Sequence, residues 1–216
     1  MEQFISITGI AAPLFRANID TDLLIPSRDI TSTGKEGYGD KLLSPWRYMA
    51  GPDGQRLENP EFVLNRPTFR HAVTLIAGEN FGSGSSREVA VWAIRQFGFR
   101  CVIAPSFGTI FRNNCYRNGV LPVELPLATV SELAREAESG QLALTVNLTE
   151  SAVLHPDGRR FVFDVPSGER DMLLEGIDAI GLTLKDRGLI EAFQHADRRT
   201  RPWIWEAGEP ARISGA

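Results

Sequence analysis

Short apolar runs alternate with amphipathic stretches through the middle of the chain. Three apolar runs, at residues 72–77, 101–104 and 120–124, have the length and composition of strands buried on both faces of a sheet. Between them, residues 86–97 and 109–117 have the spacing of helices, and a glycine follows each within two residues. The order strand, helix, strand, helix, strand predicts a parallel sheet with crossover helices.

The flanking segments extend this sheet. The same patterns predict a strand at 4–14, a helix at 131–138, strands at 142–148 and 160–165, and helices near 170–174 and 184–196. The two later strands flank the turn His155-Pro156-Asp157-Gly158, which predicts a β-hairpin. The expected fold class is therefore α/β, with a mostly parallel sheet, crossover helices and one hairpin.

Two segments do not follow these patterns. Glycine and proline repeatedly interrupt residues 27–67, and long irregular stretches of this kind are usually functional lids or disordered. Aromatic residues within it, such as Tyr38 and Trp46, favour a folded lid. Residues 198–216 carry basic and aromatic side chains followed by small polar ones, and we expect a tail that is loose or docked on a partner.

Composition narrows the function classes. The chain has 216 residues with 43% hydrophobic and 23% charged, which fits one large globular domain or two small ones. A formal net charge of −4, with both signs interspersed, argues against a nucleic-acid partner, because the phosphate backbone selects a basic face. No apolar stretch approaches the roughly 18 residues of a membrane span, and no secretory signal is visible, so we expect a cytoplasmic protein without a membrane partner.

Metal-binding residues are sparse. Cys101 and Cys115 fall in segments predicted to be a buried strand and a helix, which favours two small buried hydrophobic residues in a reducing compartment. Two cysteines cannot hold a metal cluster unaided, and His71, His155 and His195 are far apart in sequence. We therefore expect no metal site within this chain.

The richest candidate site lies between a buried strand and a helix, at residues 78–88. Gly82 and Gly84 allow the backbone to approach a ligand closely, and the start of a helix offers unpaired N–H groups and a positive dipole end. Arg87, expected in the first helical turn, can hold a carboxylate with two hydrogen bonds. Plain capping is the alternative, because Ser85-x-x-Glu88 forms a capping box. The loop is neither a Walker loop nor a dinucleotide fingerprint, since it lacks the Gly-Lys-Ser/Thr ending and the third glycine.

The string Asn80-Phe-Gly-Ser-Gly-Ser-Ser-Arg-Glu88 strongly resembles the signature of the swivelling domain of the aconitase superfamily. Collinear stretches resemble the family of 3-isopropylmalate dehydratase small subunits; they are Asn18-Ile-Asp-Thr-Asp22 with Ile25-Pro26, Tyr38-Gly39 with Trp46-Arg47-Tyr48, residues 59–65, Val102-Ile-Ala-Pro-Ser-Phe107, Asn118-Gly-x-Leu-Pro122 and residues 176–184. The resemblance covers about residues 4–195. It implies a swivelling β/β/α domain over residues 1–197, with a substrate-selecting lid at about 27–67 and a C-terminal tail at 198–216.

The resemblance also implies a partner and a reaction. The partner would be a large subunit that carries a [4Fe–4S] cluster, and this chain would hold no cofactor of its own. The reaction would isomerise 2-isopropylmalate and 3-isopropylmalate, a step of leucine biosynthesis, by dehydration and rehydration. By residue matching, Ser85 would be the base, Arg87 would bind a substrate carboxylate, and Ser86 and Gly84 would contact the substrate.

Further candidates follow from the same matching. Asp20, Thr21 and Asp22 have either a role as turn formers or a supporting role around the site, and Glu88 is a further supporting residue. Candidates for substrate contact in the lid are Arg28, Thr33, Lys35 and Tyr38.

The sequence departs from the family pattern in three places. Ser83 stands where the family usually has cysteine, Val89 replaces a histidine, and residues 27–31 are less apolar than expected. These differences keep open a related hydro-lyase acting on another hydroxy diacid, such as dimethylmalate, citraconate or citramalate, maleate, or homoaconitate. A non-catalytic anion-binding module is the remaining alternative.

Overall fold

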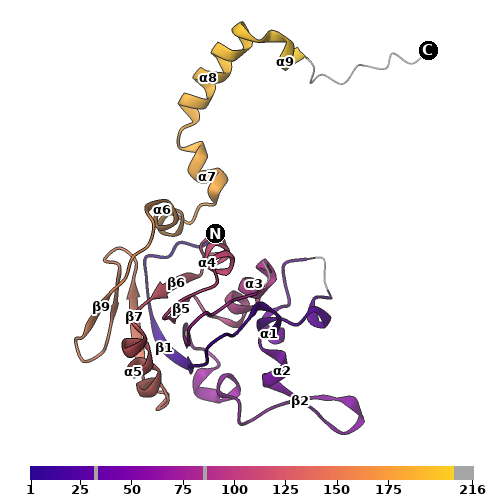
Figure 1. The fold of residues 1–216 in the computed structure, drawn as a ribbon, viewed down its shortest axis with the longest axis vertical. Coiled ribbons are helices and arrows are strands. Elements are labelled where there is room, and N and C mark those ends of the chain that lie inside the picture. The colour runs from indigo at the N-terminus through magenta and orange to yellow at the C-terminus, as the bar shows by residue number, and fades with distance from the viewer. Residues whose placement is uncertain (32–33, 85–86, 207–216) are drawn as a thin grey trace. The chain divides into compact units, whose positions relative to one another are not determined.

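The computed structural model describes residues 1–31, 34–84 and 87–206 (Figure 1). The chain forms two compact units, Met1–Asp178 and Ala179–Ala216. The boundary expected near residue 197 falls instead inside the second unit, because helix α8 (Arg187–Thr200) runs without a break through that position. Each unit is described by itself.

A seven-stranded mixed sheet forms the centre of the first unit, in the order β6-β5-β4-β1-β7-β8-β9 (Figure 1). Its strands are β1 (Ser6–Leu14), β4 (Thr74–Ala77), β5 (Cys101–Ala104), β6 (Leu121–Glu124), β7 (Ala143–Asn147), β8 (Ala152–Leu154) and β9 (Arg160–Val162). The strands from β6 to β1 are parallel. Strand β7 pairs antiparallel with β1, β8 with β7, and β9 with β8. The α/β class with crossover helices and a hairpin is confirmed.

The hairpin itself differs from the prediction. The turn at His155 joins β8 to β9, whereas β7 lies between β1 and β8. Strand β8 has only three residues and directly follows the turn after β7, so its pattern is too short to be separated from a loop. The antiparallel share of the sheet is therefore larger than expected.

Helices pack on both faces of the parallel strands. Helix α3 (Glu88–Phe97) and α5 (Leu127–Ala137) bury their apolar sides in two different hydrophobic clusters. Successive residues of β4 and β5 alternate between these clusters, which is why both strands are almost wholly apolar. Helix α4 (Thr109–Arg117) contributes to both, and α6 (Ser167–Glu175) packs against α4. The predicted helix at 131–138 begins four residues earlier than expected, at Leu127.

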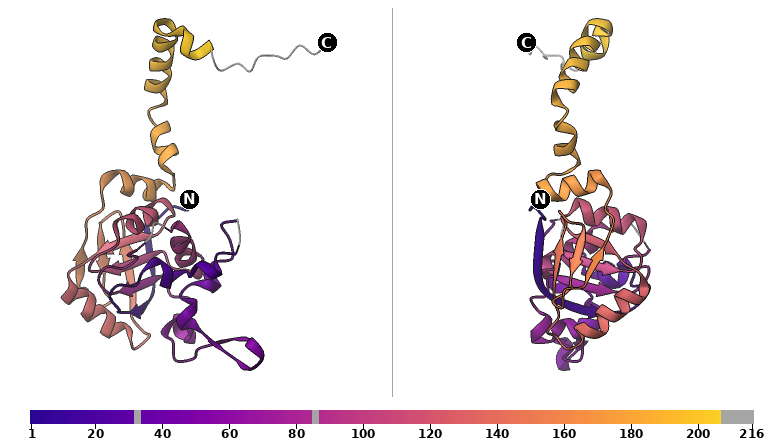
Figure 2. Two further views of the ribbon diagram at one scale, coloured as in Figure 1. Left: turned by 45° about the vertical axis from the view of Figure 1, so that its right-hand side comes forward. Right: turned by 90° about the vertical axis from the view of Figure 1, so that its left-hand side faces the viewer.

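The lid is folded and built from short elements. These are α1 (Thr21–Leu24) at its entry, η1 (Ser27–Asp29), η2 (Gly39–Lys41), α2 (Ser44–Arg47), β2 (Tyr48–Ala50), η3 (Pro52–Gly54), β3 (Arg56–Glu58), η4 (Val63–Asn65) and η5 (Pro67–Phe69). Figure 2 shows the β2–β3 hairpin extending from the body of this unit. The buried Arg47 ties the lid together: its Nε donates to Asn65 Oδ1 at 3.0 Å, and its Nη1 donates to the Gly39 carbonyl at 3.1 Å. Burial lowers the pKa of Arg47 from its ordinary value, and the hydrogen bonds compensate for part of its lost hydration.

The second unit is helical where it is described. It contains α7 (Ala179–Leu184), α8 (Arg187–Thr200) and α9 (Pro202–Glu206), so residues 198–206 are helical or directly between helices rather than a loose tail. Side-chain contacts at the end of α8 account for this: Asp197 accepts hydrogen bonds from Arg201 and from the Trp205 indole N–H. No helix in the described part of the chain is long and apolar enough to cross a membrane.

A charged network fixes the β8–β9 turn and gives it a predictable pH dependence. His155 lies between the carboxylates of Glu136 and Asp157, at 2.7 Å from each, and Arg159 bonds to both acids. The Arg159 backbone N–H, followed by the His155 and Arg159 side chains, lowers the pKa of Asp157 to about 2. Because its folded pKa is depressed, Asp157 stabilises the fold above its unfolded pKa, and this contribution disappears as the pH falls towards 2.

We expect Asp157→Asn to unfold at lower urea concentration than the parent chain at about pH 6, with the difference closing towards pH 2. The measurement is urea unfolding followed by circular dichroism across this range. Asp164→Asn is the matched control, because Asp164 is exposed and its side chain has no hydrogen bond or ion pair with the described residues. A stability difference between Asp157→Asn and the parent chain that is the same at every pH would contradict the assigned role.

Candidate functional site

The glycine-rich loop after β4 is held by the segment that follows β1. The Gly82 backbone N–H donates to the Ile19 carbonyl at 2.7 Å, and the Thr21 N–H donates to the Ser83 carbonyl at 2.9 Å. Asp20 and Ser83 also form an isolated parallel bridge. Two loops at the carboxyl ends of adjacent parallel strands thus form one surface, the place where open α/β sheets usually bind ligands.

Glycine is required at position 82 for two reasons. Its φ is +71°, a left-handed conformation, and a Cβ built there would lie 2.2 Å from the Phe111 ring. Phe111 is itself buried and packs edge-to-face on Phe81 with ring centroids 5.4 Å apart. The loop therefore rests directly on the aromatic core. Gly84 also has a positive φ of +92°, but its Cβ position is more open, 3.6 Å from Asp20 Cβ.

Arg87 forms an ion pair with Asp22 across the two loops. The side chain of Arg87 is 28% exposed and that of Asp22 is 59% exposed, so the pair faces solvent. Asp20 has a different role: its Oδ1 accepts from the Leu23 N–H at 2.7 Å and caps α1. Of the two acids, Asp20 is the turn former and Asp22 is the residue that orients Arg87.

The helix start differs from the predicted capping box. Helix α3 begins at Glu88 with Arg87 as its N-cap residue, so Glu88 cannot occupy the third helical position that a box requires. Instead, the Glu88 carboxylate accepts from the Asn118 amide at 2.9 Å. The placement of Arg87 in the first helical turn was wrong for the same reason. Val89, which replaces the family's histidine, is half-buried against the core.

The lid candidates lie in different environments. Lys35 reaches over the Trp92 ring of α3 at 5.3 Å, and Arg28 is exposed in η1. Tyr38 is 1% exposed, and its ring packs near Trp92, so its position is that of a core residue rather than a substrate contact. Ser85, Ser86 and Thr33 lie outside the described residues.

The two cysteines do not fit a metal cluster. Both are free and fully buried, and burial raises the pKa of the Cys101 and Cys115 thiols well above their usual range, which disfavours the thiolate needed for ligation. Among the described residues, no group of three histidine, cysteine, aspartate or glutamate side chains could hold a metal ion.

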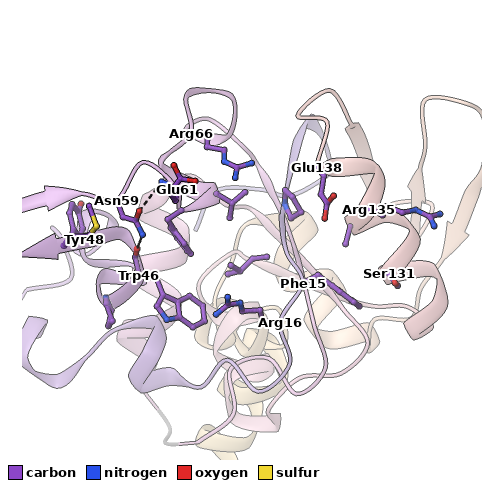
Figure 3. A pocket seen from close by; sticks show the side chains of 17 residues that line it. Phe15, Arg16, Trp46, Tyr48, Asn59, Glu61, Arg66, Ser131, Arg135 and Glu138 are labelled. Carbon is purple, nitrogen blue, oxygen red and sulfur yellow. Dashed lines mark hydrogen bonds between the residues drawn. The ribbon is translucent and has the colours of Figure 1, made fainter.

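A cleft beside the end of β1 was not predicted from the sequence. Figure 3 shows it between the lid and α5, with Arg16 beside Trp46 and Arg66 across the opening. Its lining comes from three segments far apart in the chain, and only their folding together brings these residues to one place.

Comparison with known proteins identifies the class to which this fold and loop belong. The profile of the aconitase C-terminal domain family matches residues 1–128. A 3-isopropylmalate dehydratase small subunit from Cupriavidus necator is 52% identical over 206 residues, which are 94% of this chain and 98% of that protein. Its counterpart from Dinoroseobacter shibae is 46% identical over 94% of this chain and 100% of that protein.

A crystal structure of 3-isopropylmalate dehydratase from Methanocaldococcus jannaschii has the same fold. It is 24% identical, with a TM-score of 0.62 over 88% of this chain and 99% of that one. The chain therefore belongs to the aconitase C-terminal domain family and, within it, to the small subunits of 3-isopropylmalate dehydratase.

The Asp22–Arg87 pair carries a kinetic prediction. We expect Asp22→Asn to lower kcat/KM about 10-fold, because Arg87 loses the partner that orients it, while stability changes by less than about 1 kcal/mol, as is usual for exposed pairs. Steady-state kinetics and thermal unfolding measure the two effects. Glu124→Gln, which breaks the similarly exposed pair with Arg112 outside the lid, is the control and should leave kcat/KM unchanged. If Asp22→Asn and the control variant have the same kcat/KM, Asp22 does not orient Arg87 for the reaction.

Proposed function

We propose that this chain is the small subunit of a heterodimeric hydro-lyase that interconverts 2-isopropylmalate and 3-isopropylmalate in leucine biosynthesis. Its large-subunit partner carries the [4Fe–4S] cluster. Among the described residues of this chain, the two cysteines are free and buried, and no group of histidine, cysteine, aspartate or glutamate side chains could hold a metal ion. The enzyme acts in the cytoplasm, where a reducing environment is compatible with two free buried thiols. The observation that carries the proposal is the glycine-rich loop, held by the β1 loop and ending in an arginine oriented by an acid.

Arg87 binds one carboxylate of the diacid substrate. Its guanidinium offers two parallel N–H donors that match a carboxylate, and Asp22 restricts its orientation from one side. The first N–H groups of α3 add the positive end of the helix dipole at the same place. A substrate anion would thus offset the unfavourable position of an arginine at a helix start.

Ser85 takes the proton from the carbon next to a substrate carboxylate, and Ser86 and Gly84 contact the substrate. In the dehydration direction the C–H electron pair forms the double bond as the neighbouring C–O bond breaks. The proton goes to Ser85 and the oxygen leaves as hydroxide, so the substrate loses the elements of one water. Rehydration returns the water with the hydroxyl on the other carbon. A serine oxygen can act as a base only if its alkoxide is stabilised, and the cationic loop supplies such an environment.

The lid selects the substrate's side chain. Arg28, Thr33 and Lys35 are its polar candidates, whereas the burial of Tyr38 limits that residue to supporting the lid from beneath. Because residues 27–31 are less apolar than in typical relatives, a smaller diacid such as dimethylmalate is the second candidate substrate.

A substrate comparison tests the assignment. The chain is reconstituted anaerobically with its large subunit, iron and sulfide, and the unsaturated intermediate is followed by ultraviolet absorbance with isopropylmalate and dimethylmalate in parallel. We expect preference for isopropylmalate. Turnover of dimethylmalate alone would move the chain to a related hydro-lyase, and a complex without turnover of either would favour the binding module.

A further inference from the structure

The cleft beside β1 has a volume of about 960 Å³ and is open to solvent. One wall is the end of β1 and the residues after it, another is the lid from Pro45 to Arg66, and the third is the outer side of α5. Two arginines define its charge. Arg16 lies over the Trp46 ring, with its guanidinium carbon 4.8 Å from the centroid, and Arg66 lies across the opening (Figure 3).

Neither arginine is neutralised within residues 1–31, 34–84 and 87–206: neither Arg16 nor Arg66 has an ion pair or a side-chain hydrogen bond there. Arg135, which also lines the cleft, likewise has no side-chain hydrogen bond or ion pair with the described residues. By contrast, Arg47, Arg70 and Arg100 each bond to another residue of the chain. Two glutamates, Glu61 and Glu138, line the cleft together with the three arginines. The charged side chains of the cleft therefore sum to one positive charge. An acidic segment that crosses the cleft would meet one cationic partner at Arg16 and a second at Arg66.

The cleft also exposes apolar surface. Phe15 is 40% exposed and Met49 is 48% exposed, and the half-buried rings of Trp46 and Phe62, which pack on each other, line the same cleft. Aromatic residues, methionine and arginine are the types enriched at the centres of protein interfaces. A small polar anion would leave this apolar surface uncovered, whereas a protein segment would cover it.

The segment that carries Arg16 also touches the start of the candidate loop. The Gly78 N–H, at the start of the glycine-rich loop, donates to the Arg16 carbonyl at 3.2 Å, and the Asn18 N–H donates to the Glu79 carbonyl at 2.8 Å. The end of β1 and the end of β4 are in parallel register at the same edge of the sheet. A subunit that covers the loop at this edge can therefore reach the cleft through the segment at residues 16–18.

We infer that the cleft receives an acidic segment of the catalytic large subunit, with one carboxylate at Arg16, another at Arg66, and apolar side chains against Phe15 and Met49. This inference rests on the proposed function, because that function supplies the partner. It assigns to Arg16 and Arg66 a role in subunit recognition that is separate from the chemistry at Arg87.

Charge reversal at the cleft tests the inference. The double variant Arg16→Glu/Arg66→Glu and the control Arg117→Glu, an exposed arginine on α4, are titrated into the large subunit. The concentration for half-maximal activity and the Kd from calorimetry are both measured at low and high salt. We expect the double variant to raise both values about 30-fold, with kcat at saturation unchanged, and to reduce their salt dependence. The control should match the parent chain.

The outcomes separate the two proposals. Parent-like titration by the double variant, beside a parent chain that activates normally, overturns the inference and leaves the proposed function standing. A parent chain that neither binds nor activates the large subunit overturns both. If isopropylmalate alone binds the isolated chain and the double variant abolishes that binding, the cleft is a small-molecule site and the inference is wrong. Restored affinity on reversing an acidic residue of the large subunit supports it directly.

Discussion

Arg87→Lys should lower kcat/KM about 10²–10³-fold while the chain still folds and joins its partner. Lysine keeps the positive charge but replaces a planar fork of donors by a single ammonium group, so a carboxylate loses one of two parallel hydrogen bonds. The orientation provided by Asp22 is also lost, because a lysine side chain is flexible and shorter. Steady-state kinetics of the reconstituted enzyme, together with circular dichroism of the free chain, measure both parts.

Arg112→Lys is the matched control for this experiment. Arg112 is also paired with an acid, Glu124, at 3.2 Å on the surface, but it has no place in the site. Its replacement should change kcat/KM less than about twofold, as expected for an exposed ion pair. Near-normal turnover by Arg87→Lys would show that the arginine acts only through its charge or not at all.

Gly82→Ala should destabilise the first unit by about 3 kcal/mol and lower its Tm by about 8 °C. The added methyl group has no room, because its position lies 2.2 Å from Phe111 Cγ and that ring is fixed in the core. The backbone conformation at φ +71° adds strain. Urea unfolding and thermal unfolding of the free chain measure the loss, and turnover should fall because the loop must move away from Ile19.

Gly158→Ala separates strain from overlap in this experiment. Gly158 has a φ of +94°, but a Cβ there meets no atom within 4 Å. The substitution should therefore cost only about 1 kcal/mol, from backbone strain alone. If the two alanine variants lose the same stability, the contact between the loop and Phe111 does not constrain the site.

The buried parallel strands were the most predictable part of the fold. Strand β5 and helix α4 have the same bounds in the sequence prediction and in the structure. In these segments local pattern and burial agree, because β5 is buried on both faces and α4 ends at Asn118-Gly119. Strand β8 and helix α9 were missed, because three to five residues are too few for a periodic pattern.

The site could be predicted only in part. The glycine-rich loop and Arg87 are local features of the sequence, and the resemblance assigned roles to them. The pairing of Arg87 with Asp22, 65 positions away, depends on the parallel register of β1 and β4. The cleft beside β1 is lined by three segments that are distant in sequence, so no local sequence pattern predicts it. The burial of Tyr38 was missed because an aromatic residue in an irregular segment can equally be a ligand contact or a core residue.

If this chain completes a hydro-lyase, turnover by the large subunit must depend on its presence, and this dependence can be measured directly. The large subunit, loaded with its cluster, is assayed with isopropylmalate by ultraviolet absorbance before and after addition of one equivalent of this chain. We expect no turnover before the addition and sustained turnover after it, and the Ser85→Ala variant should form the complex without activating it. Turnover that does not depend on the added chain, or full activity with Ser85→Ala, would contradict the proposed function.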